Sequence, residues 1–186
     1  AGRPEDLTLT PFHSFHGRRH TVYLDLYTED EWRAEETRRR AEEARLHDIE
    51  ERTVDRVRIG EMQPERDHNL EGDNTGAGDW QGRKWRHATD GGWFAFDLQT
   101  APDASQDLVV TYWGSETGAR TFDVLVDGQK LATQTLDNDK PGEFFDTAYP
   151  LPEKLLKGKK KITVRFQAHP GNFAGGIFDA RIMRKK

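Results

Sequence analysis

The sequence contains no cysteine among its 186 residues. That absence excludes disulfides, cysteine-ligated zinc and cysteine nucleophiles. It leaves the cellular compartment open, and we favour a secreted or periplasmic one. Long hydrophobic runs are also missing: no stretch approaches the roughly 18–20 apolar residues that span a membrane. The chain opens at Ala1-Gly2 directly into polar sequence without a signal peptide, which indicates a piece of a longer protein.

An excess of positive charge is missing as well. The net charge is −5 and the pI is about 5.8, so we expect neither nucleic acid nor a membrane as a partner. The basic residues at 157–161 and 184–186 are expected to form a solvated turn and a solvated end. The composition is polar, with 34% hydrophobic and 33% charged residues, yet ten Phe, five Trp and four Tyr can build a core of modest size.

The first third of the chain predicts a β segment followed by a helix. Residues 21–27 alternate apolar and other side chains, so residues 1–27 are interpreted as the tail of a preceding β domain. Residues 28–52 predict one long charged helix of strong helix formers, about 36 Å long. Thr28 and Glu31 have the spacing of a capping box. We interpret residues 28–53 as a linker helix, mostly solvated.

From residue 54 onward the pattern is all β. The Asp127-Gly128 pair between two alternating runs predicts a two-residue hairpin turn. Eight short strands with turns between them predict a β-sandwich over residues 54–186. The strand candidates are Val54–Ile59, Trp93–Leu98, Leu108–Trp113, Thr121–Val126, Gln129–Leu136, Glu143–Tyr149, Lys161–Ala168 and Ile177–Met183.

Several separate blocks of the sequence carry a family resemblance. Residues 11–32 and 51–78 resemble the C-terminal region of bacterial glycoside hydrolases of the β-L-arabinofuranosidase type, the DUF1680 group. Other blocks, among them GRKWRHATDGGWFAFDL and KKKITVRFQAHPGNFAGGIFDARI, resemble the accessory domain at the end of some of those enzymes. The resemblance implies a galactose-binding-domain-like jelly roll that follows the β segment and the helix. It also implies that catalysis belongs to an upstream barrel, so no catalytic residue can be carried over.

We therefore expect this chain to be no enzyme in itself but a non-catalytic accessory domain of a glycoside hydrolase. Its expected partners are carbohydrate, in the form of arabinose-containing glycans, and the upstream catalytic domain of the same polypeptide. The alternative is a purely structural domain that braces the catalytic domain or an oligomer and has no ligand of its own. An independent hydrolase with two paired carboxylates is a third, weaker interpretation, because no motif marks such a pair.

The stretch from His68 to Leu98 predicts a polar, glycine-rich loop with three tryptophans that runs into a strand. Such loops are typical of sugar-binding rims, because an aromatic face stacks on a sugar while polar groups bond its hydroxyls. Contact with another domain is an equal alternative for Trp80 and Trp85, whereas Trp93 and Trp113, on predicted strands, are expected in the core. The candidate sugar-binding residues are Trp80, Trp85, Arg83, Arg86, Asn172 and Phe173.

No cofactor is required by these interpretations, but a structural calcium ion is one option. Glu71 and Asp73 offer oxygen ligands on the expected loop, and Asp179 offers one on the last strand. The alternative is that the same side chains form turns with the backbone. A histidine-rich stretch, with His13, His16 and His20, is interpreted as a surface turn rather than a metal site.

Overall fold

The computed structural model describes residues 25–102 and 104–186. Contacts divide the chain into two compact units, residues 1–48 and 49–186. Most of the expected β segment at 1–27, together with its histidines, lies outside the described residues. None of the described helices has the length and apolar character of a membrane span.

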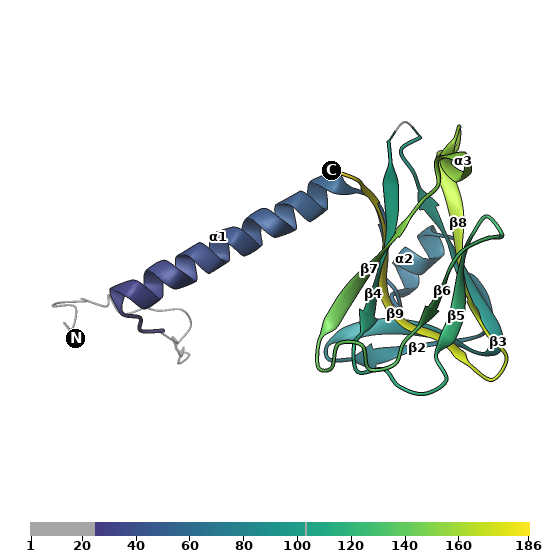
Figure 1. Ribbon diagram of the computed structural model, residues 1–186, viewed down its shortest axis with the longest axis horizontal. Coiled ribbons are helices and arrows are strands. Elements are labelled where there is room, and N and C mark those ends of the chain that lie inside the picture. Colours follow the sequence, from purple (N-terminus) through teal and green to yellow (C-terminus); the bar gives the residue numbers. More distant parts are fainter. Residues whose placement is uncertain (1–24, 103) are drawn as a thin grey trace, which may run out of the picture. The chain divides into compact units, whose positions relative to one another are not determined.

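The first unit is dominated by α1 (Glu29–Arg52) (Figure 1). Its predicted capping box is confirmed: the Glu31 carboxylate accepts the Thr28 N–H at 2.7 Å, and Thr28 Oγ1 accepts the Glu31 N–H at 3.3 Å. Glutamates and arginines pair along the helix at i,i+3 and i,i+4 spacing. None of its residues is buried, so charge pairing and strong helix formers, rather than packing, hold the helix.

The second unit is mainly β, as predicted. Its strands form one path in the order β6-β5-β8-β3-β9-β4-β7, with β1 paired to β9 and β2 paired to β3. The strands are β1 (Thr53–Val57), β2 (Glu71–Trp80), β3 (Arg83–Gln99), β4 (Gln106–Trp113), β5 (Thr121–Val126), β6 (Gln129–Thr135), β7 (Phe144–Pro150), β8 (Lys161–Ala168) and β9 (Phe173–Arg184). The short helices are α2 (Met62–Asp67) and α3 (Glu153–Leu156).

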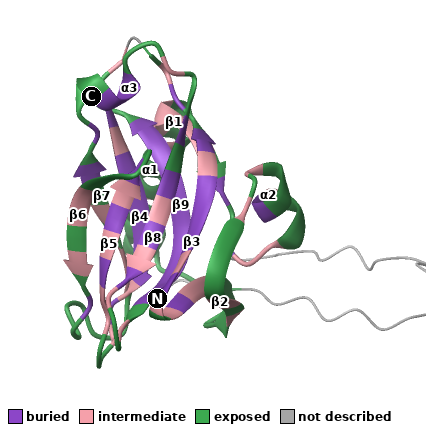
Figure 2. Ribbon diagram, turned by 90° about the vertical axis from the view of Figure 1, so that its right-hand side faces the viewer, coloured by how far each residue is buried: buried purple, intermediate pink, exposed green. Residues whose placement is uncertain are grey.

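The path folds into two layers that enclose the core. Strands β6, β5 and β8 form one side and β9, β4 and β7 the other (Figure 1), and β3 connects the two by pairing with both β8 and β9. Alternate residues point inward, as on β5, where Phe122, Val124 and Val126 are fully buried. Figure 2 shows these buried positions along the strands and the exposed ones at loops and edges.

The predicted strands are confirmed with small shifts of their ends. The Asp127-Gly128 turn has φ values of 48° and 76°, the two positive values that this hairpin turn requires. The largest difference is at residues 71–92, where a loop was expected. That stretch forms all of β2 and the first half of β3.

Candidate functional site

The β2–β3 hairpin builds the candidate site. The turn between its strands, Gln81-Gly82, has φ values of 49° and 73° and so closes a two-residue hairpin. Glycine, asparagine and aspartate are rare in strands, which is why the composition of β2 predicts a loop. Pairing with β3 overrides that local preference, and nine register pairs join the two strands.

Alternation along the hairpin separates its side chains onto two faces. Trp80 pairs with Arg83, Gly78 with Trp85, and Gly76 with His87. Because directly opposed residues share a face, all six belong to the same side of the hairpin. Ala77, Arg86 and Ala88 belong to the other side, where Ala88 enters the core.

Glycines on β2 make room for flat rings from β3. A Cβ atom on Gly78 would lie only 2.5 Å from Cζ2 of Trp85, so the indole lies where a side chain at residue 78 would be. The His87 ring follows, with its centroid 4.9 Å from that of Trp85. We call Trp85 and His87, lying over Gly78 and Gly76, the aromatic platform; both rings are half-buried. Burial and the charges of nearby arginines lower the pKa of His87, so its ring is neutral at pH 7.

A second aromatic group lies at the tip of the hairpin. Trp80 is 50% exposed, and its ring meets the edge of Trp113 with 6.3 Å between centroids. The Arg83 guanidinium lies 4.3 Å from the centre of the Phe144 ring, which packs in turn against Phe178. This tip cluster offers a half-exposed indole beside a cation that has no carboxylate within ion-pair distance among the described residues.

The other end of the platform meets the start of β9 and the loop after β4. Phe173 is 37% exposed and packs against His87 with 5.6 Å between centroids. Arg120 lies over the Phe173 ring at 5.4 Å and donates to the Gly175 carbonyl at 2.6 Å. Its guanidinium also pairs with Glu116 at 2.8 Å. Burial raises the pKa of Glu116, although Arg120 and the Gly176 amide oppose the shift.

Four of the six predicted sugar-binding residues therefore come together: Trp80, Arg83 and Trp85 on one hairpin face and Phe173 beside it. Arg86 points to the opposite face, where Glu65 holds it at 2.8 and 2.7 Å. The Asn172 side chain is occupied too, because its oxygen accepts the Thr121 N–H and its amide donates to the Pro170 carbonyl.

The sequence did not single out His87, Phe144, Arg120 or Glu116. The spacing G-x-G on one strand, opposite W-x-H on the next, is the signal that marks the platform. It becomes visible only when residues 71–80 are recognised as a strand.

The candidate calcium ligands lie apart in the structure. Glu71 and Asp73 are exposed on β2, next to Ala95 and Trp93 of β3. Asp179 is buried on β9, where its carboxylate accepts from Arg56 at 2.6 Å and burial raises its pKa. Within the described ranges no three histidine or acidic side chains gather as a metal site would require.

The prediction that Trp93 and Trp113 fill the core is wrong, because neither ring belongs to the buried cluster. On β3 and β4 the inward positions are taken by the neighbours Phe94 and Tyr112, both fully buried. Alternation turns the tryptophans outward. Trp93 stacks there under the Arg165 guanidinium at 3.9 Å, and Trp113 joins the tip cluster.

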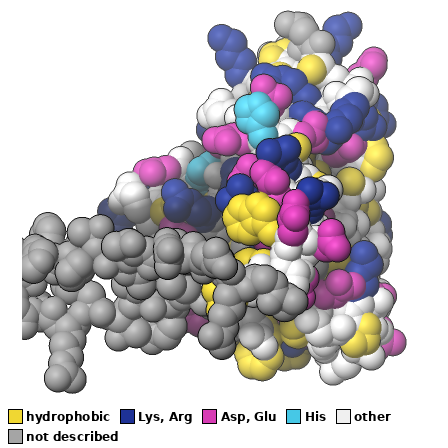
Figure 3. Space-filling model, turned by 90° about the vertical axis from the view of Figure 1, so that its left-hand side faces the viewer, with side chains coloured by type: hydrophobic (Ala, Val, Ile, Leu, Met, Phe, Trp, Pro, Cys, Tyr) yellow, Lys and Arg dark blue, Asp and Glu magenta, His cyan; other side chains and the backbone are white. Residues whose placement is uncertain are grey.

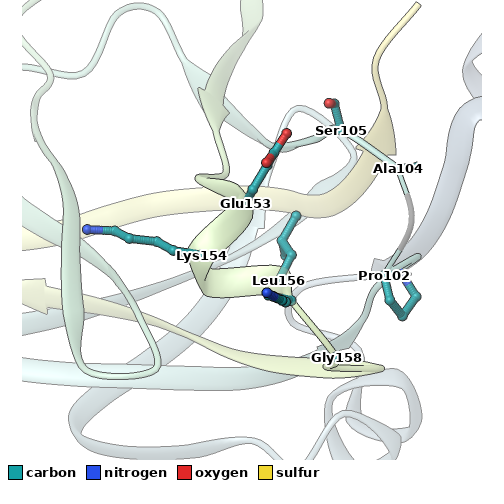
Figure 4. A pocket seen from close by; sticks show the side chains of 8 residues that line it. Pro102, Ala104, Ser105, Glu153, Lys154, Leu156 and Gly158 are labelled. Carbon is teal, nitrogen blue, oxygen red and sulfur yellow. The ribbon is translucent and has the colours of Figure 1, made fainter.

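Charges and cavities elsewhere offer less to a ligand. Figure 3 shows acidic and basic side chains interspersed over one face, with hydrophobic side chains in small groups between them. A cavity of about 470 Å³ lies beside α3, at the end of the second unit away from the hairpin tip (Figures 1 and 4). It has no aromatic lining residue, and α3 contributes Glu153, Lys154 and Leu156 to it. The hairpin face is therefore the better candidate for a polar ligand.

Comparison with known proteins gives one family and several structural neighbours. A model described as a family of unknown function (DUF6805) matches residues 48–183. No curated protein matches the chain.

The structural neighbours include three sugar-binding proteins. A family 35 carbohydrate-binding module from Clostridium thermocellum aligns with a TM-score of 0.48 and 13% identity, over 63% of this chain and 93% of that one. A family 6 module from Clostridium cellulolyticum, in complex with xylose, aligns with a TM-score of 0.41 and 8% identity, over 70% and 96%. An exo-β-1,3-galactanase from Phanerochaete chrysosporium, with β-1,3-galactotriose, aligns with a TM-score of 0.48 and 12% identity, over 61% and 27%.

Proposed function

We propose that this chain, which belongs to the DUF6805 family, binds carbohydrate through the face of the β2–β3 hairpin that carries Trp80 and Trp85. The observation that carries the proposal is the indole of Trp85 lying over Gly78. A flat ring supported by backbone suits stacking on the apolar face of a sugar. Glycine within a strand reduces packing and backbone stability. The close approach of the indole is the feature that requires it at residue 78.

The surroundings of the platform supply the other requirement, polar groups that bond hydroxyls. Arg83 at the tip and the Glu116–Arg120 pair at the far end border the aromatic rings. Shallow sites of this kind bind single sugars weakly, with dissociation constants on the order of 10⁻³ to 10⁻⁴ M, or about −4 to −5.5 kcal/mol.

We further propose that the glycan contains arabinose and that the domain is a non-catalytic accessory part of a glycoside hydrolase. The sequence resemblance to the ends of β-L-arabinofuranosidase-type enzymes supports this assignment. The non-catalytic character is supported by the chemistry of the hairpin face, since the described contacts place one carboxylate there, Glu116, already in an ion pair. Glycoside hydrolysis ordinarily needs two.

The test is a calorimetric titration of the chain with arabinose-containing oligosaccharides, repeated with xylo- and galacto-oligosaccharides. The parent chain should give a saturable heat of binding. The affinity should be at least tenfold lower in Trp85→Ala and in Trp80→Ala. Trp93→Ala is the matched control, because its ring lies on β3 outside the hairpin platform, stacked with Arg165. Equal binding by Trp85→Ala and the parent would disprove the site, and absence of heat across the panel would favour the structural-brace alternative.

A further inference from the structure

The structure places a carboxylate beside the aromatic platform. Glu116 lies in the loop after β4, and its side chain is 17% exposed. A Cβ atom built on Gly176 would lie 3.4 Å from Oε1 of Glu116 and 3.6 Å from Cβ of Trp85. A methyl group at residue 176 would therefore contact both groups, so the carboxylate and the Trp85 side chain lie on either side of this glycine.

The Glu116 carboxylate is held in place before any ligand arrives. Oε2 pairs with the Arg120 guanidinium at 2.8 Å, and the nearby Gly176 N–H, like Arg120, lowers the pKa of the carboxyl against the effect of burial. Arg120 is itself fixed by the carbonyls of Gly175 and Thr117, at 2.6 and 3.2 Å. A preorganised group of this kind loses little conformational freedom when it binds.

The carboxylate also keeps unused hydrogen-bonding capacity. An ionised carboxylate has about four acceptor positions and no donor, and the Arg120 pair together with the nearby Gly176 N–H takes up at most two of them. The remaining positions can accept hydrogen bonds from a ligand. On a neutral sugar the groups that donate them are the free hydroxyls. Bonds from hydroxyls to an ionised oxygen are roughly twice as strong as neutral ones.

We propose that Glu116 selects the ligand of this site by accepting hydrogen bonds from two neighbouring free hydroxyls of a sugar ring stacked on Trp85. Arg120 is the positioning residue, since it orients the carboxylate. The proposal rests on the proposed carbohydrate-binding function and adds the class of ligand: a glycan unit with an unsubstituted pair of adjacent hydroxyls. A site built to bond a hydroxyl strongly rejects the analogue that lacks it.

The experiment compares two probes on the full chain. The first is the tightest binder among the methyl glycosides of arabinose, xylose and galactose, and the second is the same glycoside methylated on two adjacent hydroxyls. Binding is followed by NMR shifts of the tryptophan indole signals. The parent should prefer the free diol at least tenfold, and Glu116→Gln should reduce that preference to less than about threefold, because the amide replaces an acceptor by a donor.

Two controls make the result decisive. Glu153→Gln changes an acid on α3, away from the hairpin, and should leave the preference unchanged. The thermal midpoint of each variant establishes that it is folded. A Glu116→Gln variant that keeps the parent's full preference would overturn the inference while leaving carbohydrate binding intact. If Trp85→Ala binds as the parent does, or the parent binds no glycoside, the proposed function fails and the inference fails with it.

Discussion

The buried pair between Glu65 and Arg86 should control the stability of the hairpin rather than its binding. Glu65 lies on α2 and Arg86 on β3, with side chains 5% and 11% exposed. Two guanidinium nitrogens of Arg86 donate to the carboxylate at 2.8 and 2.7 Å. The carboxylate also accepts the Gly60 N–H at 2.7 Å, and Arg86 reaches Thr75 Oγ1 on β2 at 3.2 Å. The pair therefore ties α2 to both hairpin strands.

Replacement of Glu65 by Gln leaves the Arg86 charge buried without its counter-charge. Breaking a buried pair by removing one partner costs about 3–5 kcal/mol. For a folded unit of this size one kcal/mol corresponds to roughly 3–5 °C in the thermal midpoint. We therefore expect Glu65→Gln to lower the midpoint by about 10–25 °C.

The measurement is thermal unfolding followed by circular dichroism, with Glu61→Gln as the matched control. Glu61 directly precedes α2 and faces Arg58 at 3.7 Å, with both side chains well exposed. Its loss should cost no more than about 1 kcal/mol. A Glu65→Gln midpoint within 3 °C of this control would refute the reasoning. The thermal midpoint of Arg86→Met should drop by about as much as that of Glu65→Gln. Arg83→Met should have the midpoint of the parent but bind glycan more weakly.

Three further predictions concern the platform, the sheet and the helix. Gly78→Ala should displace the Trp85 indole and weaken glycan binding at least threefold by titration, whereas Gly76→Ala, whose Cβ would lie 3.5 Å from the His87 ring, should bind as the parent does. Burial raises the pKa of Asp97, but bonds from Lys161 and its other partners outweigh burial and lower it overall. The ionised carboxylate thus stabilises the fold above about pH 4, and chemical denaturation should show that the advantage of the parent over Asp97→Asn disappears as the pH falls through the lowered value. The charge pairs of α1 are exposed and no residue of the helix is buried, so 1 M salt should screen the pairs and measurably reduce the helical circular dichroism signal of the chain.

The parts of the fold that follow from local rules could be predicted from the sequence. The capping box at Thr28 and the Asp127-Gly128 turn depend on residues next to one another, and both are confirmed. Strands with clean alternation, such as β5 and β8, keep their predicted ends. In these segments composition, period and turn chemistry all indicate the same structure.

The hairpin could not be predicted because its first strand has little strand propensity of its own. Residues 71–80 contain three glycines, two aspartates and an asparagine, a composition that is typical of loops. The stretch is a strand only because β3 supplies a partner for nine of its ten residues, on both sides of a register shift between Asp73 and Thr75. The short helix α2 was missed for a related reason, since six residues are stabilised by the Glu65 contact to β3 rather than by their own propensity.

The two arginines of the hairpin show how predicting a loop in place of a strand changes the choice of candidate site residues. As residues of a loop, Arg83 and Arg86 are equivalent candidates for bonding a sugar. As residues of one strand three positions apart, they must lie on opposite faces. The strand's later half already fixes which face is which, because Phe94 and Phe96 are buried and Trp93 is not. Counting back by twos from Phe94 places Arg86 on the inner side and Trp85 and Arg83 on the outer side. The structure shows this division, so the start of β3, more than any single residue type, decides which side chains can meet a ligand.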